Sequence, residues 1–219
     1  MVRLSKSVLP PSITIKSEDD YRKGEVLQLL SEDCHNKCYI CECKPTTINV
    51  EHIKSRKNNP KLEFDWNNLF IACGHCNSIK STKYDDILDP TKCDPEEHIA
   101  LSVDISDKIM DGVKIETLTT DSSTLMTAEL LEFVYNGGST DMKRIESTNL
   151  RNSHLMPNIH LFYRYISNHK EEPDLGYDKL ICKEIRHSSI FAAFKRKIVR
   201  DDPKLAEVFS DLLDDISAT

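Results

Sequence analysis

Hydrophobic and polar residues alternate in two nearby stretches of the chain. Residues 46–53 (TTINVEHI) alternate and are rich in β-branched side chains, and residues 68–73 (NLFIAC) are mostly apolar, so both are predicted to be strands. Residues 54–67 between them are basic and polar, which is typical of a loop. A helix is expected to open at Asn77. This part of the chain therefore predicts the order strand, loop, strand, helix.

The N-terminal residues predict an extended arm and then a helix. Residues 1–16 contain Pro10-Pro11 and an alternating SITIK segment, which favours an extended arm or an edge strand. Ser17 is a predicted N-cap, and the acidic residues after it suit the positive end of a helix dipole. The apolar positions that follow, up to Cys34, predict that this helix packs on the unit with the two strands.

Beyond residue 83 the pattern is mainly helical. The alternation in residues 101–118 predicts a β-hairpin with its turn at Asp111-Gly112. Helices are expected from Ser123 or Thr124 to Tyr135, over residues 141–169 with an interruption near Pro157, over residues 175–187 and 188–201, and from Pro203 to Ser217.

These patterns define a fold class and a domain division. We expect an α+β protein in which a small unit of two strands and a helix precedes a mostly α-helical C-terminal region. The predicted division is residues 1–36 for the arm and its helix, 37–83 for the small unit, and 84–219 for the C-terminal region, which is a candidate surface for docking a partner.

Composition narrows the class of protein. No apolar run approaches the roughly 18 residues that a membrane span needs, and the N-terminus lacks the apolar segment of a signal peptide. Eight cysteines would suit a secreted disulfide protein, but four of them have zinc spacing, so we expect a reducing, cytoplasmic location and no membrane partner. The net charge of −7 argues against a nonspecific nucleic-acid coat protein.

The charge is unevenly distributed. Residues 37–83 carry eight Lys and Arg against four Asp and Glu, whereas residues 84–219 carry sixteen against twenty-six. A positive cluster of this kind suits the binding of phosphate groups. The predicted nucleic-acid contacts are four cations of the first range: Lys54, Arg56, Lys57 and Lys83.

Two C-x-x-C pairs separated by a few tens of residues indicate a zinc site. Their thiolates would supply the four tetrahedral ligands of a closed structural zinc site: Cys38, Cys41, Cys73 and Cys76. Other residues crowd these pairs, and any of them could replace a ligand: Cys34, Cys43, His35 and His75. The symmetry of the two pairs favours the first four. Cys93 and Cys182 read as ordinary thiols.

The residues between and after the cysteine pairs resemble the HNH nuclease family of the ββα-metal type, which has a treble-clef-like zinc frame. The resemblance rests on Glu51-His52, on Asn68-Leu69, and on Asn77 directly after the second C-x-x-C, and it covers about one-fifth of the chain. It implies a metal-dependent endonuclease. His52 would be the general base, Glu51 and Asn77 would bind a catalytic Mg²⁺ or Mn²⁺, Asn68 would be structural, and Lys80 would contact phosphate.

The chemistry of the residues agrees with these implied roles. Hydrolysis of a phosphodiester needs an activated water and stabilisation of charge on the phosphate. A histidine near its ordinary pKa can take the proton of water, and Mg²⁺ prefers oxygen ligands such as Glu51 and Asn77. One geometric condition remains. Adjacent residues of a regular strand point to opposite faces, so Glu51 and His52 share a site only if the strand ends or bulges there.

A wider resemblance links later segments to the HNH subunits of Septu-type antiphage systems and their retron-linked relatives. It rests on the DPTKCDPEEHI segment, on TAELLEFVYNG, on residues 146–151 and on IFAAFKRK at residues 190–197. It implies an ABC-type ATPase as partner and a role in bacterial defence.

Three alternatives stay open at this point. The substrate is DNA by default, but RNA, including tRNA, suits the same motif. The zinc unit could instead be a nucleic-acid-binding or protein-binding module without activity. A stand-alone restriction or homing-type nuclease is the third reading, although the sequence shows no obvious sequence-reading motif.

Overall fold

The computed structural model describes residues 1–22, 24–104, 112–137, 140–172 and 175–214. It is a mixed α and β structure in which helices outweigh two small sheets, as the sequence predicts. The elements up to residue 117 are α1 (Glu18–Arg22), α2 (Gly24–Asp33), β1 (Ile48–His52), β2 (Leu69–Cys73), α3 (Gly74–Lys80), β3 (Ile99–Ser102) and β4 (Lys114–Thr117). The remaining helices are α4 (Ser122–Asn136), α5 (Asp141–Asn149), α6 (Met156–Glu171), α7 (Tyr177–Glu184), α8 (Ala192–Asp201), α9 (Pro203–Val208) and α10 (Ser210–Asp214).

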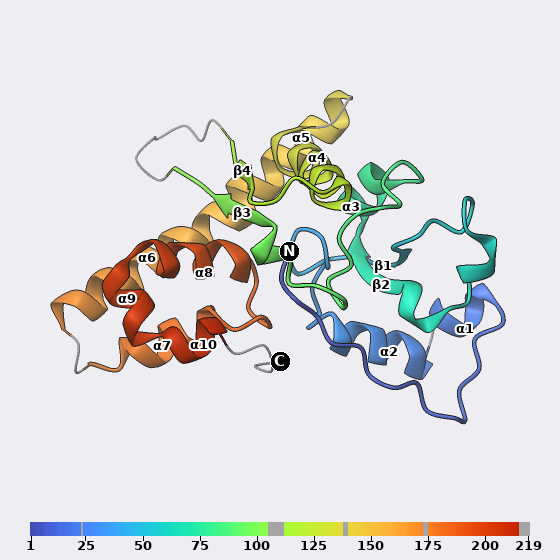
Figure 1. Ribbon diagram of the computed structural model, residues 1–219, viewed down its shortest axis with the longest axis horizontal. Helices are drawn as coiled ribbons and strands as arrows, with labels where there is room; N and C mark the ends of the chain where they lie inside the picture. The colour runs from blue at the N-terminus through green and yellow to red at the C-terminus, as the bar shows by residue number, and fades with distance from the viewer. Residues whose placement is uncertain (23, 105–111, 138–139, 173–174, 215–219) are drawn as a thin grey trace.

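The elements gather into two sides (Figure 1). Helices α1 and α2 lie beside the β1–β2 pair on one side, and helices α6 to α10 lie on the other, with β3, β4 and α4 near the middle. Short 3₁₀ helices at Pro60–Leu62, Trp66–Asn68 and Pro95–Glu97 shape the loops. Within the described residues, every helix is too short or too polar to cross a membrane.

Strands β1 and β2 are antiparallel, with Ile48 opposite Cys73 and His52 opposite Leu69. The side chains of β2 from Leu69 to Ala72 are fully buried because α2 and α3 pack against this pair. Helix α3 begins at Gly74, so the predicted start at Asn77 is wrong by one turn. The cause is a cap that the sequence pattern did not reveal: the Cys73 sulfur accepts a hydrogen bond from the amide of Cys76 at 3.4 Å.

The predicted hairpin of residues 101–118 corresponds to the antiparallel pair β3–β4, in which Ser102 lies opposite Lys114. Its predicted turn at Asp111-Gly112 falls partly outside the described residues. Helix α4 begins at Ser122 with Asp121 as its N-cap, not Ser123 or Thr124, because the Asp121 carboxylate accepts from the Thr124 amide at 3.0 Å.

Two of the predicted C-terminal helices are divided. The interruption near Pro157 is a π-helical segment, Leu150–Leu155, that joins α5 to α6 without breaking the helical path. Proline lacks the amide hydrogen that an α-helix interior needs, which explains why the irregular turn lies directly before it. The last predicted helix is present as α9 and α10, and Pro203 lies in the first turn of α9 after the N-cap Asp202.

One hydrophobic core crosses the predicted boundaries at residues 36 and 83. It contains the arm residue Leu4, Leu30 of α2, Phe70 of β2, Leu131 of α4 and Phe194 of α8. A second, smaller core joins α6 to α10, with Phe162 and Ile181 fully buried. The strand pair is therefore packed as part of a larger body, and the three-part division stays a prediction.

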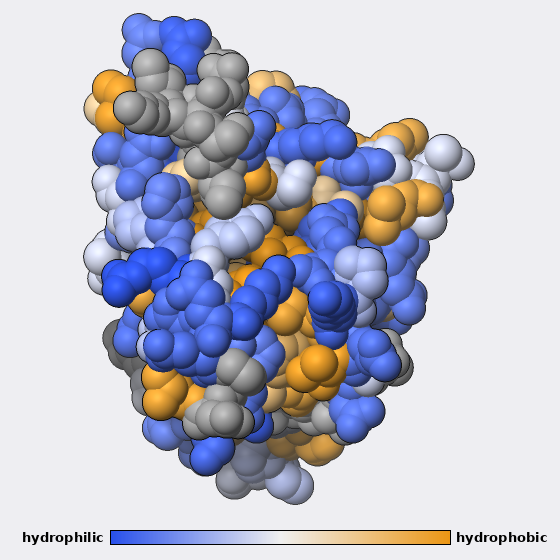
Figure 2. Space-filling model, turned by 90° about the vertical axis from the view of Figure 1, so that its left-hand side faces the viewer, coloured by the Kyte–Doolittle hydropathy of each residue, from blue (hydrophilic) through white to orange (hydrophobic). Residues whose placement is uncertain are grey.

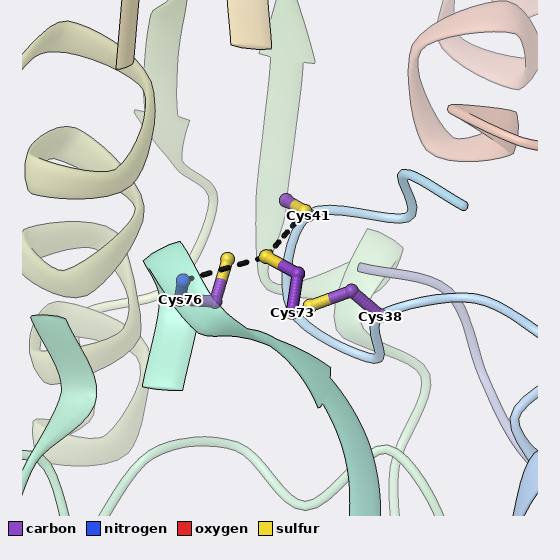
Figure 3. Close-up of side chains that lie close together, drawn as sticks. All are labelled: Cys38, Cys41, Cys73 and Cys76. Carbon is purple, nitrogen blue, oxygen red and sulfur yellow. Dashed lines mark hydrogen bonds between the residues drawn. The ribbon is translucent and has the colours of Figure 1, made fainter. Parts of the chain in front are cut away.

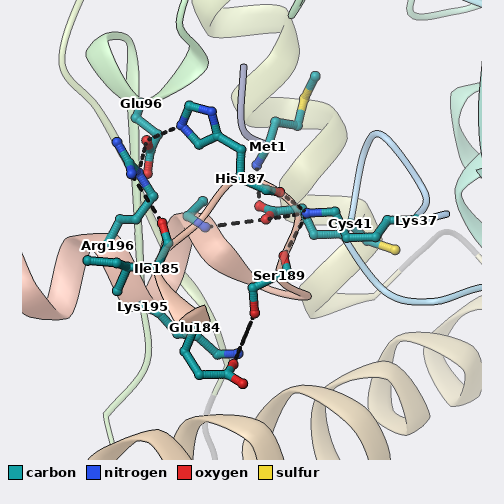
Figure 4. Close-up of polar contacts among 12 residues, drawn as sticks. Met1, Lys37, Cys41, Glu96, Glu184, Ile185, His187, Ser189, Lys195 and Arg196 are labelled. Carbon is teal, nitrogen blue, oxygen red and sulfur yellow. Dashed lines mark hydrogen bonds and ion pairs between the residues drawn. The ribbon is translucent and has the colours of Figure 1, made fainter. Parts of the chain in front are cut away.

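Buried polar contacts also tie the C-terminal region to the first cysteine pair (Figure 4). The Lys37 ammonium donates to the backbone carbonyl oxygens of His187 at 2.5 Å and Ser189 at 2.6 Å. The neighbouring Glu42 carboxylate lies 3.1 Å from the amino group of Met1 and accepts from the Ala193 amide. Residues on both sides of this cysteine pair are thus fixed to the segment that leads into α8.

A second polar cluster brings together two of the distant segments that carry the wider resemblance. The Arg196 guanidinium donates to the Glu96 carboxylate at 2.7 Å, and both side chains are almost fully buried. Arg200 forms a second ion pair with Glu96, at 3.2 Å. These residues of the DPEEH and FKRK segments therefore have a structural role in the interior (Figure 4).

The outer face of the C-terminal helices is mostly hydrophilic, with a hydrophobic band at its centre (Figure 2). A hollow on this side lies between β3, α6 and α8, with Tyr163, Ile166 and Ile198 among its lining residues. Lys170 and Asp202 at its rim form an ion pair of 2.6 Å.

Candidate functional site

The two C-x-x-C pairs meet at one point. Ligand atoms of Cys38, Cys41, Cys73 and Cys76 all lie within 4.8 Å of one another. The first pair comes from a tight loop, and the second lies at the junction of β2 and α3, so the sulfurs face each other (Figure 3). The sulfurs of Cys41 and Cys73 are 3.9 Å apart.

The ionisation of the four cysteine thiols favours a bound metal ion. Hydrogen bonding with Cys38 and Cys41 lowers the pKa of Cys73, whereas hydrogen bonding with Cys38 and Cys73 raises the pKa of Cys41. Burial raises the pKa of Cys76 well above its ordinary value. Four clustered thiols, three of them buried, cannot all ionise without a compensating cation, and Zn²⁺ binds four thiolates in tetrahedral sites. The four cysteines could therefore hold a metal such as zinc.

The residues that could have replaced a zinc ligand make other contacts or lie outside the four-cysteine cluster. The sulfur of Cys34 accepts a hydrogen bond from the Ile71 amide at 3.3 Å, and burial raises its pKa to about 11. Both ring nitrogens of His75 are engaged, by Glu146 at 3.0 Å and by the carbonyl oxygen of Val134 at 2.9 Å. Among the described residues, the metal-ligand cluster includes neither these two residues nor Cys43 nor His35.

Asn68 fixes the loop between β1 and β2. Its side-chain amide donates to the carbonyl oxygens of Lys54 at 3.0 Å and Leu62 at 2.9 Å, and its oxygen accepts from the Lys54 amide at 2.9 Å. The side chain is buried. Three hydrogen bonds from one residue hold both ends of residues 54–62 in place.

Glu51 and Lys80 form a buried ion pair beneath β1. The Lys80 ammonium lies 3.0 Å from the Glu51 carboxylate and donates to the carbonyl oxygen of His52 at 2.8 Å. Lys80 is 0% exposed, so the predicted contact between Lys80 and phosphate is wrong for this conformation, because its amine is directed inward. Burial raises the pKa of Glu51, against the opposing effect of the Lys80 charge.

His52 is the last residue of β1, and its ring lies in a different environment from the carboxylate of Glu51. Its Nε2 is 2.9 Å from the backbone carbonyl oxygen of Glu63. The ring of Tyr21 from α1 meets it edge-on, with the ring centroids 5.6 Å apart. Burial lowers the pKa of His52, in spite of the hydrogen bond to Glu63. Regular pairing runs through both residues, with Glu51 opposite Phe70 and His52 opposite Leu69, so their side chains point to opposite faces of β1. The structure therefore does not bring the Glu51 carboxylate and the His52 ring together, and their shared site stays a prediction.

Asn77 lies in the second turn of α3, one helical turn before Lys80, on the same side of the helix. It is partly buried. Among the described residues, no hydrogen bond is formed by its side-chain amide. Because Lys80 contacts Glu51, the Asn77 side of α3 is the side that packs toward β1.

Three of the four predicted nucleic-acid contacts are already paired with carboxylates. Lys54 lies 2.5 Å from Asp86, Lys83 lies 2.5 Å from Glu129, and Arg56 pairs with Glu18. Lys57 is exposed and, within the described part of the chain, has no ion pair. A phosphate would have to compete with these carboxylates, so the local excess of positive charge is smaller than the composition indicates.

Asp85 is a site-shaping residue that sequence reasoning missed. Its carboxylate accepts from the backbone amide and the hydroxyl of Ser55, both at 2.8 Å, and from the side-chain amides of Asn58 at 2.8 Å and Asn59 at 3.2 Å. It thereby fixes the loop that follows His52. Its only sequence signal is its place in an acidic connector, which does not distinguish it from the neighbouring acids.

Comparison of the chain with family models, with curated proteins and with solved structures gave no match.

Proposed function

We propose that this protein is a metal-dependent endonuclease of the HNH type, with DNA as its default substrate. The single observation that carries the proposal is the hydrogen bond between His52 Nε2 and the carbonyl oxygen of Glu63. The order β1, β2, α3 beside a four-cysteine cluster and the resemblance of the motif residues support it.

The hydrogen bond selects one form of His52. A carbonyl oxygen only accepts, so Nε2 must carry the proton, and the lone pair of the neutral ring is then on Nδ1. Burial lowers the pKa of His52, which keeps the ring neutral near pH 7. The edge contact with Tyr21 restricts rotation of the ring. Nδ1 can therefore take a proton from a water molecule that attacks phosphorus.

Glu51 and Asn77 offer oxygen donors for a catalytic Mg²⁺ or Mn²⁺ in the proposed enzyme. Such an ion would stabilise the negative charge that develops on the phosphate and on the leaving oxygen. The donor set fits a hard cation, because a buried carboxylate whose pKa is raised by burial is stabilised by added positive charge nearby. Lys80 fixes the Glu51 carboxylate and the end of β1 together.

Two other readings share the same zinc unit. RNA, including tRNA, is the alternative substrate, and a non-catalytic binding module is the alternative function. The wider resemblance also implies an ABC-type ATPase partner and a role in antiphage defence, which stays a prediction.

The test is cleavage of plasmid DNA and of transfer RNA by zinc-loaded protein. We expect cutting that requires added Mg²⁺ or Mn²⁺ and that is lost in His52→Ala. Omission of the added ion, rather than chelation, leaves the zinc site intact. Cutting of RNA alone would assign the substrate to RNA. Absence of cutting of both substrates by zinc-loaded protein, with and without the predicted ATPase, would leave the binding module as the function.

A further inference from the structure

Unpaired positive charge gathers on α7 and on the residues that directly follow it. Lys179, Lys183 and Arg186 line a surface hollow of about 500 Å³ together with Cys182, Ser188 and Ser189. All three cations are exposed, and their spacing along α7 and its end places them on one side. No carboxylate of the described residues lines this hollow.

Neither of the acidic residues of α7, Asp178 or Glu184, is among the lining residues of the hollow. Glu184 accepts from Lys195 and from the Ser189 hydroxyl. In the part of the chain that the structure describes, none of the three cations that line the hollow forms an ion pair. Lys54, Arg56 and Lys83 near the strand pair differ, because each lies against a carboxylate.

This arrangement is unfavourable without an anion. Like charges one turn apart on a helix repel. A bound anion would offset the repulsion. Among the described residues, the lining offers the cationic groups of Lys179, Lys183 and Arg186 and the Ser188 hydroxyl, and it has no aromatic ring on which a base could stack. The hollow therefore suits phosphate groups rather than bases.

We propose that Lys179, Lys183 and Arg186 bind the phosphate backbone of a nucleic acid at a position remote from the strand pair. Figure 1 places α7 with the C-terminal helices, on the side away from β1 and β2. The proposal rests on the proposed nuclease function and adds a second contact for long substrates. Backbone contacts fix position without reading sequence.

The test is the salt dependence of binding to a labelled DNA duplex of about 30 base pairs. Full-length, zinc-loaded protein is used without added Mg²⁺ or Mn²⁺. Three lost phosphate contacts should reduce the slope of log K against log salt by about 2.7, and affinity at 0.15 M salt should fall roughly 100-fold. The variant is Lys179→Gln, Lys183→Gln and Arg186→Gln combined.

A matched control removes three exposed cations that already face carboxylates: Lys92→Gln, Lys114→Gln and Arg144→Gln. It changes the net charge by the same amount, and we expect its slope to stay near that of the wild type. If both variants lost the same amount of affinity and slope, the effect would come from net charge alone, and the proposal would be overturned. So would an unchanged slope in the α7 variant, or absence of duplex binding by the wild type at 50 mM salt.

Two parallel measurements separate this proposal from the others. If the wild type cuts in a metal-dependent way and the α7 variant binds the duplex as tightly as the wild type, the nuclease function is supported and the α7 site is ruled out. If the α7 variant loses duplex binding and the wild type does not cut, the α7 site is supported and the nuclease function is ruled out. Loss of inorganic phosphate binding in calorimetry without loss of duplex binding would assign the hollow to free phosphate and also overturn the proposal.

Discussion

A single backbone contact decides what His52 can do. The sequence identifies the residue through its motif, but its partner is the carbonyl oxygen of Glu63, eleven residues later in the loop. A carbonyl group is present at every position of a chain, so no sequence pattern marks the one that orients a histidine. The structure shows that this oxygen faces Nε2, and from that contact we infer that Nε2 carries the proton.

The pH dependence of cutting tests this orientation. A general base must be unprotonated, so the rate rises with pH through the pKa of His52 and is then constant. Because burial lowers this pKa from 6.5, we expect the single-turnover rate to be half-maximal below pH 6.5 and to level off at higher pH. The measurement is the cleavage rate at saturating Mg²⁺ between pH 5 and 8. A half-maximal rate above pH 7 would contradict the assignment.

For Lys80, unlike His52, the structure disagrees with the role that the sequence motif predicts. Its place three residues after Asn77 matches the motif, and a lysine on a helix is usually exposed. In the structure its amine is directed under β1, toward Glu51 and the carbonyl oxygen of His52. The sequence could not distinguish these roles because the packing of α3 on β1, which depends on where the helix begins, decides the direction of the side chain.

At the scale of elements, the cysteine spacing was the most informative signal. Two C-x-x-C pairs predict that their sulfurs meet, and the strand that carries Cys73 pairs in the register that brings this about. The start of α3 was harder to predict because a cysteine is an unusual N-cap, and sequence rules expect Ser, Thr, Asp or Asn there. The irregular Leu150–Leu155 segment was foreseen only as an interruption near a proline.

Replacement of one zinc ligand should unfold the unit. Cys38→Ser removes one of four thiolates, and structural zinc contributes about 10 kcal/mol or more to the folding of small zinc domains. We expect purified Cys38→Ser protein to lack zinc and to have no cooperative melting transition of the strand pair. The measurements are zinc content by mass spectrometry and thermal unfolding by circular dichroism.

Cys43→Ser is the matched control for this experiment. Cys43 lies close to the same loop but outside the ligand cluster, and its thiol contacts the carbonyl oxygen of Lys44. Zinc content of one per chain and a wild-type melting temperature are expected. Retention of zinc by Cys38→Ser, or its loss from Cys43→Ser, would mean that the ligand set is different.

At the scale of the whole molecule, the C-terminal region completes the core of the strand unit. The Tyr135 hydroxyl of α4 donates to the carbonyl oxygen of Cys41 at 3.0 Å, and Lys37 donates to two carbonyl oxygens near α8. The wider motif segments meet through Glu96 and Arg196. Such contacts between distant segments depend on the final packing, so a sequence pattern read locally could not anticipate them.

Residues 1–83 alone should therefore fail to fold. The fragment would expose the surface that Leu131, Tyr135 and Phe194 cover in the full chain, and it would leave Lys37 without its backbone acceptors. We expect a broad, non-cooperative thermal transition even with added zinc, against a cooperative one for the full chain. A sharp transition with one bound zinc per fragment would instead show that the N-terminal part is an independent domain.

The central claim is that His52 is the general base of a nuclease, and its most direct test is the rate of plasmid cleavage by His52→Ala. The matched control is His98→Ala, because His98 is also a partly buried histidine, bonded to Thr119 and Thr124. Both variants should keep zinc, and neither should aggregate. We predict that His52→Ala cuts at least about 100-fold more slowly, as loss of a general base implies, and that His98→Ala cuts at the wild-type rate. Cutting by zinc-loaded His52→Ala at the wild-type rate would contradict the account.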